Sequence, residues 1–284
     1  MASIIDTVDA SAKELIPEGS GVLVAVSGGI DSMVLMHVLQ QLAAKHRWRL
    51  VVAHFNHKLR SRASNADQRL VQKVAQRLKL KLTTASWRAG KVSIKKYGLE
   101  MAARNARFSF LDKAARRHRC THIATGHHRG DQVETFFLRL FRGAGGVGLG
   151  GMRQVDDFPL NSSLKTSRLL LTFEKIEIRK FAIEEKVKFR EDNSNQDITI
   201  LRNRIRSKLL PYLHRNFNTG IVHPINQSQE LIGADAEFAR DTAREWLDGK
   251  KKSPFEELHL AVQRWVIWHQ LIELGIDPQY RQIE

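Results

Sequence analysis

Cysteine is almost absent from this sequence of 284 residues, in which Cys120 is the single thiol. One cysteine excludes an internal disulfide and any zinc or iron–sulfur site built from several cysteines. Long apolar runs are missing as well, because no segment approaches the roughly 18 residues that a membrane-spanning helix needs. The N-terminal segment has no basic stretch followed by an apolar one, as a secretory signal would. These absences favour a cytoplasmic protein without a membrane partner.

Acidic residues are scarce relative to basic ones. The chain has 46 Lys and Arg against 30 Asp and Glu, which gives a net charge of +16 and a pI of about 10.2. Such an excess favours polyanionic partners, because contacts to phosphates release counterions. The sequence therefore predicts a nucleic-acid partner, with a solvated basic surface as the alternative.

Strand and helix signals alternate in the first half of the chain. Short apolar runs predict buried strands, and the segments between them predict helices. The expected strands are 21–26, 50–54, 81–86 and 121–125, and the expected helices are 33–44, 66–78, 99–118 and 131–142. This alternation predicts an α/β fold with a parallel sheet, in which ligands bind at the carboxyl ends of the strands.

The second half has a different pattern. Only helices are expected after residue 201, and a polar loop is expected at 190–197. We therefore predict an α/β domain at 1–215 and a small helical domain at 216–284. The glycine-rich segment 143–151 contains the dinucleotide-binding spacing G-x-G-x-x-G, but it follows a helix rather than a strand, so we expect a mobile loop there.

A phosphate loop is expected between the first strand and the first helix after it. Its residues are Ser27, Gly28, Gly29, Ile30, Asp31 and Ser32. Backbone N–H groups at a helix N-terminus attract anions, and two glycines let a phosphate approach the backbone closely. Asp31 suits such a loop if it holds a Mg²⁺ ion that the phosphates share. The G-x-x-x-x-G-K-[ST] pattern of the common P-loop is absent, and a serine-capped helix is the plainer alternative.

A second polar cluster follows the strand expected at 121–125. Asp131 and Glu134 are three residues apart and share one helix face, where paired carboxylates could bind Mg²⁺ or a cationic substrate. The alternative is a capping box, with Asp131 as the cap. Two strand-end clusters in one sheet favour a functional site, with Asp31 and Asp131 as the candidate Mg²⁺ ligands.

Basic residues recur at three further places. Arg104 and Arg107 share a helix face and suit phosphate contacts, although an ion pair of Arg104 with Glu100 is equally consistent with the spacing. The basic residues expected to face RNA are Arg139, Arg142, Arg202, Arg204, Arg206 and Lys208. Compensation of a helix dipole and a solvated helix are the alternatives for these residues.

Five segments, in this order and spacing, resemble the tRNA(Ile)-lysidine synthases, a family of the N-type ATP pyrophosphatases. The segments are AVSGGIDSMVLMHVL, HFNHKLRSRASNADQ, ARNARFSFL, ATGHHRGDQVETFFLRLFRGAG, and REDNSNQD followed by RNRIRSKLLPYL. The resemblance implies a Rossmann-like ATP pyrophosphatase domain followed by a small helical tRNA-binding domain. It implies that residues 27–32 bind ATP, and that the family's acidic and basic pairs are matched by Asp131, Glu134, Arg104 and Arg107.

Membership would imply a ligase that uses ATP, Mg²⁺ and free L-lysine. The wobble cytidine of tRNA(Ile) would be adenylated at C2, and the ε-amine of lysine would displace AMP to give lysidine. This chain has Gly130 where the family usually has the first of two aspartates before glutamine. It also ends inside what resembles the small helical domain, as either a short form or a truncated chain would.

Two other functions remain as alternatives. A tRNA thiolase of the same superfamily needs paired cysteines or an iron–sulfur cluster, which Cys120 alone does not supply. A non-catalytic RNA-binding relative would keep the basic surface. Gly130 favours this second alternative, and the intact phosphate loop opposes it.

Overall fold

The computed structural model describes residues 3–58, 61–87, 95, 98–191, 198–250, 253–276 and 278–283. Contacts between residues divide the chain into two compact units. The first comprises Met1–Gln132 and Met152–Asn203, and the second comprises Val133–Gly151 and Arg204–Glu284. The boundary expected near residue 215 falls inside the second unit, and the division into domains at 1–215 and 216–284 stays a prediction.

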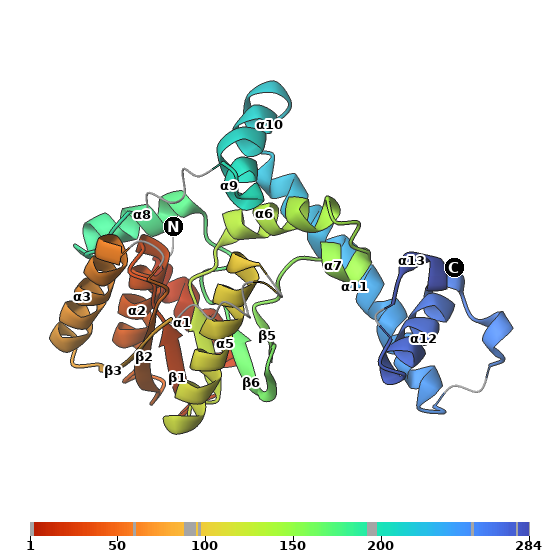
Figure 1. Ribbon diagram of the computed structural model, residues 1–284, viewed down its shortest axis with the longest axis horizontal. Coiled ribbons are helices and arrows are strands. Elements are labelled where there is room, and N and C mark those ends of the chain that lie inside the picture. Colours follow the sequence, from red (N-terminus) through yellow and green to blue (C-terminus); the bar gives the residue numbers. More distant parts are fainter. Residues whose placement is uncertain are drawn as a thin grey trace. The chain divides into compact units, whose positions relative to one another are not determined.

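A six-stranded sheet forms the centre of the first unit (Figure 1). Its strands are β1 (Gly21–Ala25), β2 (Arg49–Asn56), β3 (Lys81–Ser86), β4 (His122–Thr125), β5 (Val155–Phe158) and β6 (Asn161–Ser167). The strand order is β3-β2-β1-β4-β6-β5, and all neighbours are parallel except β5, which runs antiparallel to β6. The predicted α/β fold with a parallel sheet is confirmed, and the antiparallel edge is an addition to it.

Helices cover both faces of this sheet. They are α1 (Ile4–Leu15), α2 (Ile30–Leu42), α3 (Ser61–Arg77), α5 (Leu99–Arg117) and α8 (Lys175–Glu184). Successive side chains of a strand point to opposite faces. Val22 and Val24 of β1 therefore pack with α1, α2, α3 and α8, whereas Leu23 packs with α5. A strand buried on both faces reads as a continuous apolar run, as β1 does.

The second unit is built from helices, as expected after residue 201. Besides the later part of α6 (Arg129–Leu140), its elements are α7 (Gly146–Leu149), the end of α9 (Leu201–Arg204), a π-helical turn (Ile205–Leu209), α10 (Leu210–Asn216), α11 (Val222–Leu247), a 3₁₀ turn (Phe255–Glu257), α12 (Leu260–Glu273) and α13 (Tyr280–Ile283). Ala239 and Ala243 of α11 pack on Val262 and Val266 of α12. No helix in the described part of the chain is both long enough and apolar enough to span a bilayer.

The expectation of a mobile loop at 143–151 is wrong for its centre, where α7 packs on α11. A Cβ on Gly146 would lie 2.8 Å from Cβ of Ala236, and a Cβ on Gly150 would lie 2.6 Å from Cα of Gly233. These contacts are closer than real Cβ atoms allow, so side chains at both positions would push the two helices apart. Gly146 and Gly150 therefore serve close helix packing.

Candidate active site

The predicted phosphate loop joins the end of β1 to the start of α2. Gly28 has φ +101°, a conformation that side chains rarely adopt, and a Cβ there would lie 3.3 Å from Cβ of Asp67. The Ser32 hydroxyl donates to Gly29 O at 3.0 Å, so the Ser27 hydroxyl is the donor in its 3.1 Å contact with Ser32 Oγ. The two serines thus fix the loop's shape. The first N–H groups of α2, which have no partner within the helix, are left for an anion.

Asp31 is paired with a lysine that no motif indicated. Lys175 Nζ lies 2.5 Å from Asp31 Oδ1 and 2.7 Å from Asp31 Oδ2. Lys175 is the first residue of α8 and lies 144 residues after Asp31 in the chain. Such a separation leaves no spacing signal in a single sequence. The fold in this way brings a lysine to a phosphate loop that lacks the lysine of the common P-loop.

The second predicted cluster lies beside this loop. His128 Nε2 is 4.0 Å from Asp31 Oδ1 and 3.7 Å from Asp131 Oδ2, so the structure brings the two aspartates together. Asp131 Oδ2 accepts the backbone N–H of His128 at 3.0 Å, and Asp131 Oδ1 is 3.5 Å from Arg202 Nη2. Asp131 is the third residue of α6, and its side chain accepts the N–H of the residue before the helix. It is therefore not the N-cap residue itself, which was the alternative considered for it.

The charges around this cluster decide its protonation. Burial alone would raise the pKa of Asp131, but His128, His127 and Arg202 together hold that pKa below its usual range. Burial lowers the pKa of His127, and Arg168 and Arg202 lower it further against the opposing charge of Asp131. Near neutral pH the aspartate is therefore ionised and His127 is neutral.

Asp31 and Asp131 both lie within 4.0 Å of His128 Nε2, and their role as Mg²⁺ ligands stays a prediction. Mg²⁺ is usually held by one or two carboxylates together with substrate phosphates and water. Across the described residues, no group of three or more His, Cys, Asp and Glu side chains is placed to hold a metal. A Mg²⁺ ion at this place would therefore depend on the phosphates of a bound nucleotide for its remaining ligands.

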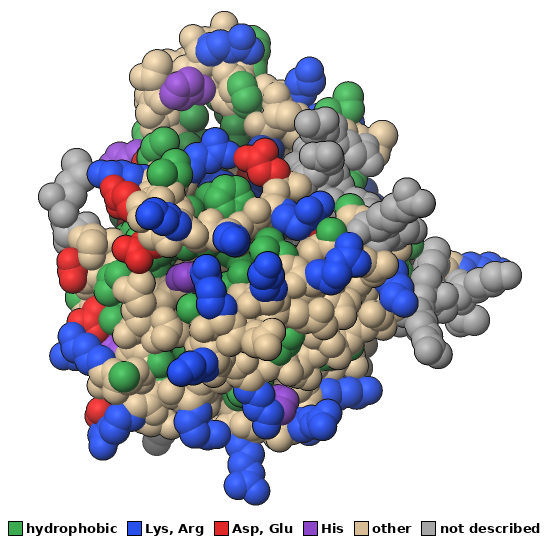
Figure 2. All heavy atoms as spheres, turned by 90° about the vertical axis from the view of Figure 1, so that its left-hand side faces the viewer, with side chains coloured by type: hydrophobic (Ala, Val, Ile, Leu, Met, Phe, Trp, Pro, Cys, Tyr) green, Lys and Arg blue, Asp and Glu red, His purple; other side chains and the backbone are tan. Residues whose placement is uncertain are grey.

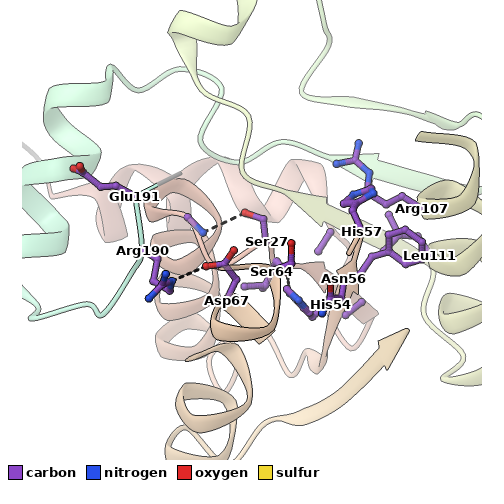
Figure 3. Close-up of a pocket in the computed structure, with 15 residues that line it drawn as sticks. Ser27, His54, Asn56, His57, Ser64, Asp67, Arg107, Leu111, Arg190 and Glu191 are labelled. Atoms are coloured by element: carbon purple, nitrogen blue, oxygen red, sulfur yellow. Dashed lines mark hydrogen bonds and ion pairs between the residues drawn. The ribbon is translucent and has the colours of Figure 1, made fainter. Parts of the chain in front are cut away.

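A cavity of about 330 Å³ opens beside the phosphate loop, a size within the range of small-molecule pockets. It is lined by residues at the carboxyl ends of β1 and β2, by α3 and α5, and by the segment after α8. Arg107, His57 and Leu111 lie on one side of it, and Arg190 and Glu191 lie on the other (Figure 3). The cavity thus sits where ligands bind in parallel α/β sheets.

Of the predicted pair on α5, Arg107 lines this cavity. Burial lowers the pKa of Arg107 to about 10, helped by the charges of Arg104 and Arg202. Its Nε atom has no hydrogen-bond partner in the described part of the chain. Arg104 instead lies over the ring of Phe108, with Cζ 4.7 Å from the ring centroid. A half-buried guanidinium among other cations suits an anionic ligand. The side chain of Glu100 lies outside the described residues.

Arg190 contacts the phosphate loop, a role that the sequence did not predict. Its backbone N–H donates to Gly28 O at 3.0 Å, and its Nε donates to Asp67 Oδ1 at 2.7 Å. Both contacts fix the loop that holds Gly28. The sequence indicated only a polar loop at 190–197, of which residues 192–197 lie outside the described part.

Glu134, in the second unit, is paired with a predicted RNA-facing residue. The side chain of Glu134 is buried, and both of its oxygens accept hydrogen bonds from Arg206. Arg206 Nη2 lies 2.8 Å from Glu134 Oε2. Such a bidentate ion pair combines the attraction of opposite charges with a fixed geometry. Glu134 therefore takes no part in a capping box with Asp131.

The other basic residues predicted to face RNA divide into two groups. Arg139 Nη1 donates to Gly148 O at 2.6 Å and to Gly151 O at 3.0 Å, so it holds the end of α7. Arg202 contacts Asp131. The exposed members are Arg142, Arg204 and Lys208. RNA contact by any of the six stays a prediction.

Comparison with known proteins gives a consistent result. The model of the PP-loop domain family matches residues 4–213. The tRNA(Ile)-lysidine synthase of Geobacter sulfurreducens is 40% identical over 76% of this chain and 45% of that protein. The enzyme of the same name from Lactiplantibacillus plantarum is 41% identical over 78% and 48%. The chain therefore spans about half the length of these two relatives.

Other matches extend along most of both chains. The tRNA(Ile)-lysidine synthase of a Nostoc species is 34% identical over 92% of this chain and 81% of that protein. The U34-tRNA thiolase NcsA from Methanococcus maripaludis has a TM-score of 0.61 at 14% identity, over 81% of this chain and 77% of that chain, which shows a shared fold alone. On the matched domain, the phosphate loop and these relatives, this chain belongs to the tRNA(Ile)-lysidine synthase family of PP-loop proteins.

Proposed function

We propose that this protein converts the wobble cytidine of tRNA(Ile) to lysidine, with ATP and free L-lysine as its other substrates. The names of its relatives support the reaction. The observation that carries the proposal is the phosphate loop with Asp31 and Asp131 both within 4.0 Å of one imidazole nitrogen, His128 Nε2. The phosphates of ATP would bind at the N-terminus of α2, and its nucleoside would enter the adjoining cavity.

The first step of this proposal is adenylation. The cytidine O2 attacks the α-phosphorus of ATP, a new O–P bond forms, and the bond to the β-phosphate breaks to release pyrophosphate. When bound, Mg²⁺ would neutralise phosphate charge. Lys175 and Arg107 add fixed positive charge at the loop and in the cavity, where a developing anion needs it. Asp31 and Asp131 would hold the metal.

The second step is displacement of AMP. The neutral ε-amine of lysine attacks C2, the C–O bond breaks so that AMP leaves with its electron pair, and the amine loses a proton to a base. Recognition of the amino acid requires groups for its α-ammonium and its α-carboxylate. Glu134 and Arg206 have the opposite charges that suit these two groups.

Binding of the tRNA would use the excess of positive charge. Lys and Arg side chains are spread over the face shown in Figure 2 and do not form one narrow stripe. Such a distribution suits contacts with several phosphates along an RNA backbone. A cytoplasmic location, where tRNA and free lysine are both present, is expected of this function.

Substitution of Asp31 tests the proposal. We expect Asp31→Ala to lower AMP formation about 100-fold or more, because the Mg²⁺ ion that would neutralise the phosphates loses a carboxylate ligand. Affinity for tRNA, measured by filter binding, should change little. Asp157→Ala, at an exposed position on β5, is the matched control and should retain full AMP formation. Substantial AMP formation by the Asp31 variant would contradict the assignment.

A further inference from the structure

Lys175 neutralises the carboxylate that the proposed function gives to the metal. Its Nζ atom lies 2.5 Å from Asp31 Oδ1 and 2.7 Å from Asp31 Oδ2, so one ammonium group contacts both oxygens. The side chains of Lys175 and Asp31 are 46% and 28% exposed. An ion pair that is this open to water contributes little to the stability of a fold. Either side chain can therefore exchange this pair for a stronger partner.

A Mg²⁺ ion bound to Asp31 would lie very close to the ammonium group. Mg²⁺ binds carboxylate oxygens at about 2.0–2.1 Å. Bound to either oxygen of Asp31, the ion would be less than about 5 Å from Lys175 Nζ, because Nζ already contacts both oxygens. A double and a single positive charge at that distance repel each other. We therefore expect Lys175 and the metal to compete for the same carboxylate.

The side chain of Lys175 can change position without its backbone. Lys175 is the first residue of α8, and a capping box between Glu174 and Glu177 fixes the start of this helix. The Arg129 N–H donates to Phe173 O at 2.9 Å, which ties the preceding segment to α6. The ammonium group is carried on a flexible four-carbon stem. It can therefore move while the Cα atom of Lys175 stays in place.

The phosphates of ATP would offer this ammonium group a second partner at the same loop. Asp31 lies in the first turn of α2, where N–H groups without partners in the helix attract anions. Phosphates bound there would be close to the Asp31 carboxylate and to the lysine that contacts it. Lysine is a common phosphate ligand in proteins. The charge of Lys175 thus stays at the loop with either partner.

We propose that Lys175 releases Asp31 to the metal and transfers its ammonium group to the phosphates when Mg-ATP binds. This exchange rests on the proposed function, in which Asp31 is a ligand of the metal. Its consequence is that the site binds a free divalent cation poorly. Without phosphates, the cation must displace an ammonium group that has no other anionic partner at the loop. Metal and nucleotide therefore bind together.

The test is Lys175→Met, which keeps an unbranched side chain and removes its charge. In the absence of ATP, this variant should bind Mn²⁺, a paramagnetic substitute for Mg²⁺, about 10-fold more tightly than the wild type, because the competing cation is gone. Its affinity for Mg-ATP should instead fall about 10-fold, because a charged hydrogen bond to phosphate outweighs the exposed pair with Asp31. Electron paramagnetic resonance of free Mn²⁺ and equilibrium dialysis of ATP measure the two affinities.

Lys165→Met is the matched control, and it should change neither affinity. Lys165 Nζ lies 2.5 Å from Asp157 Oδ1, and the Lys165 side chain is also 46% exposed. An affinity for Mn²⁺ that stays the same or falls in Lys175→Met would overturn the proposal, and so would an unchanged affinity for Mg-ATP. Failure of the wild type to form lysidine, with the two opposite changes intact, would contradict the proposed function alone.

Discussion

Glu134 is buried and forms an ion pair with the half-exposed Arg206, and its role can be separated from that of the ATP site. Glu134→Gln keeps the shape of the side chain and removes its charge. If Glu134 holds the α-ammonium of lysine, this variant should lose about 10-fold or more in lysine incorporation, because a charged hydrogen bond is worth about 1.5–3 kcal/mol. Pyrophosphate release in the absence of lysine should fall much less.

Both activities are measured on the same preparation, with Glu230→Gln as the control at an exposed position on α11. An equal loss of the two activities in Glu134→Gln would assign the residue to ATP or its metal. Unchanged activities would leave it with a structural role in pairing Arg206.

At the scale of residues, the sequence predicted some of the groups that gather near the phosphate loop, but not what each contacts. The rule that parallel strands end at one edge correctly placed Asp31 beside Asp131. Lys175 reaches Asp31 from 144 residues away, so no local pattern indicated it. Arg139 lies at the basic end of a helix and was predicted to face RNA, but its side chain donates to the backbone carbonyl groups of Gly148 and Gly151.

At the scale of elements, Gly126 lets the end of β4 approach the start of α2. A Cβ there would lie 3.0 Å from the backbone C of Asp31 and 3.0 Å from the backbone N of Ser32. Gly126→Ala should therefore push the phosphate loop aside, with a loss of about 1–3 kcal/mol in the free energy of unfolding and weaker ATP binding. Urea unfolding and equilibrium ATP binding measure the two effects.

Gly220→Ala is the matched control, because the nearest neighbour of a Cβ on Gly220 would be the Asn218 Oδ1 atom, at an ordinary contact distance of 3.5 Å. It should leave both quantities unchanged. Unchanged ATP affinity in Gly126→Ala would show that the loop does not depend on this close approach.

Several of the elements that the sequence predicted have a clear pattern. β1 is a buried apolar run, and the apolar residues of α3 recur at the period of a helix. The β5–β6 hairpin was missed because the edge strand β5 is short and the sequence of β6, the strand beside it, is polar. The helix α1 was missed despite a capping box formed by Ser3 and Asp6. The packing of α7 depends on a partner helix that is distant in the sequence.

At the scale of the whole molecule, buried histidines make stability depend on pH. Burial lowers the pKa of four of them, His37, His54, His122 and His127. In the unfolded chain these groups take up protons near their ordinary pKa of about 6.5, whereas in the folded protein they stay neutral to lower pH. The free energy of unfolding should therefore fall from about pH 7 to about pH 5, by at most about 1.4 kcal/mol per pH unit for each histidine.

Urea unfolding across this range measures the slope. His122→Gln should make the dependence shallower, since it removes one of the four groups. Stability that stays constant or rises as the pH falls would contradict the prediction.

The proposed activity joins lysine to the wobble cytidine of tRNA(Ile). Mass spectrometry of the nucleosides of tRNA(Ile), after incubation with the protein, ATP and lysine, tests it most directly. We expect a cytidine that has gained one lysine less one water, and no product when ATP is omitted or when the wobble base is uridine. An unmodified cytidine would contradict the claim and favour an RNA-binding relative without catalysis, and a sulfur-substituted base would indicate a thiolase.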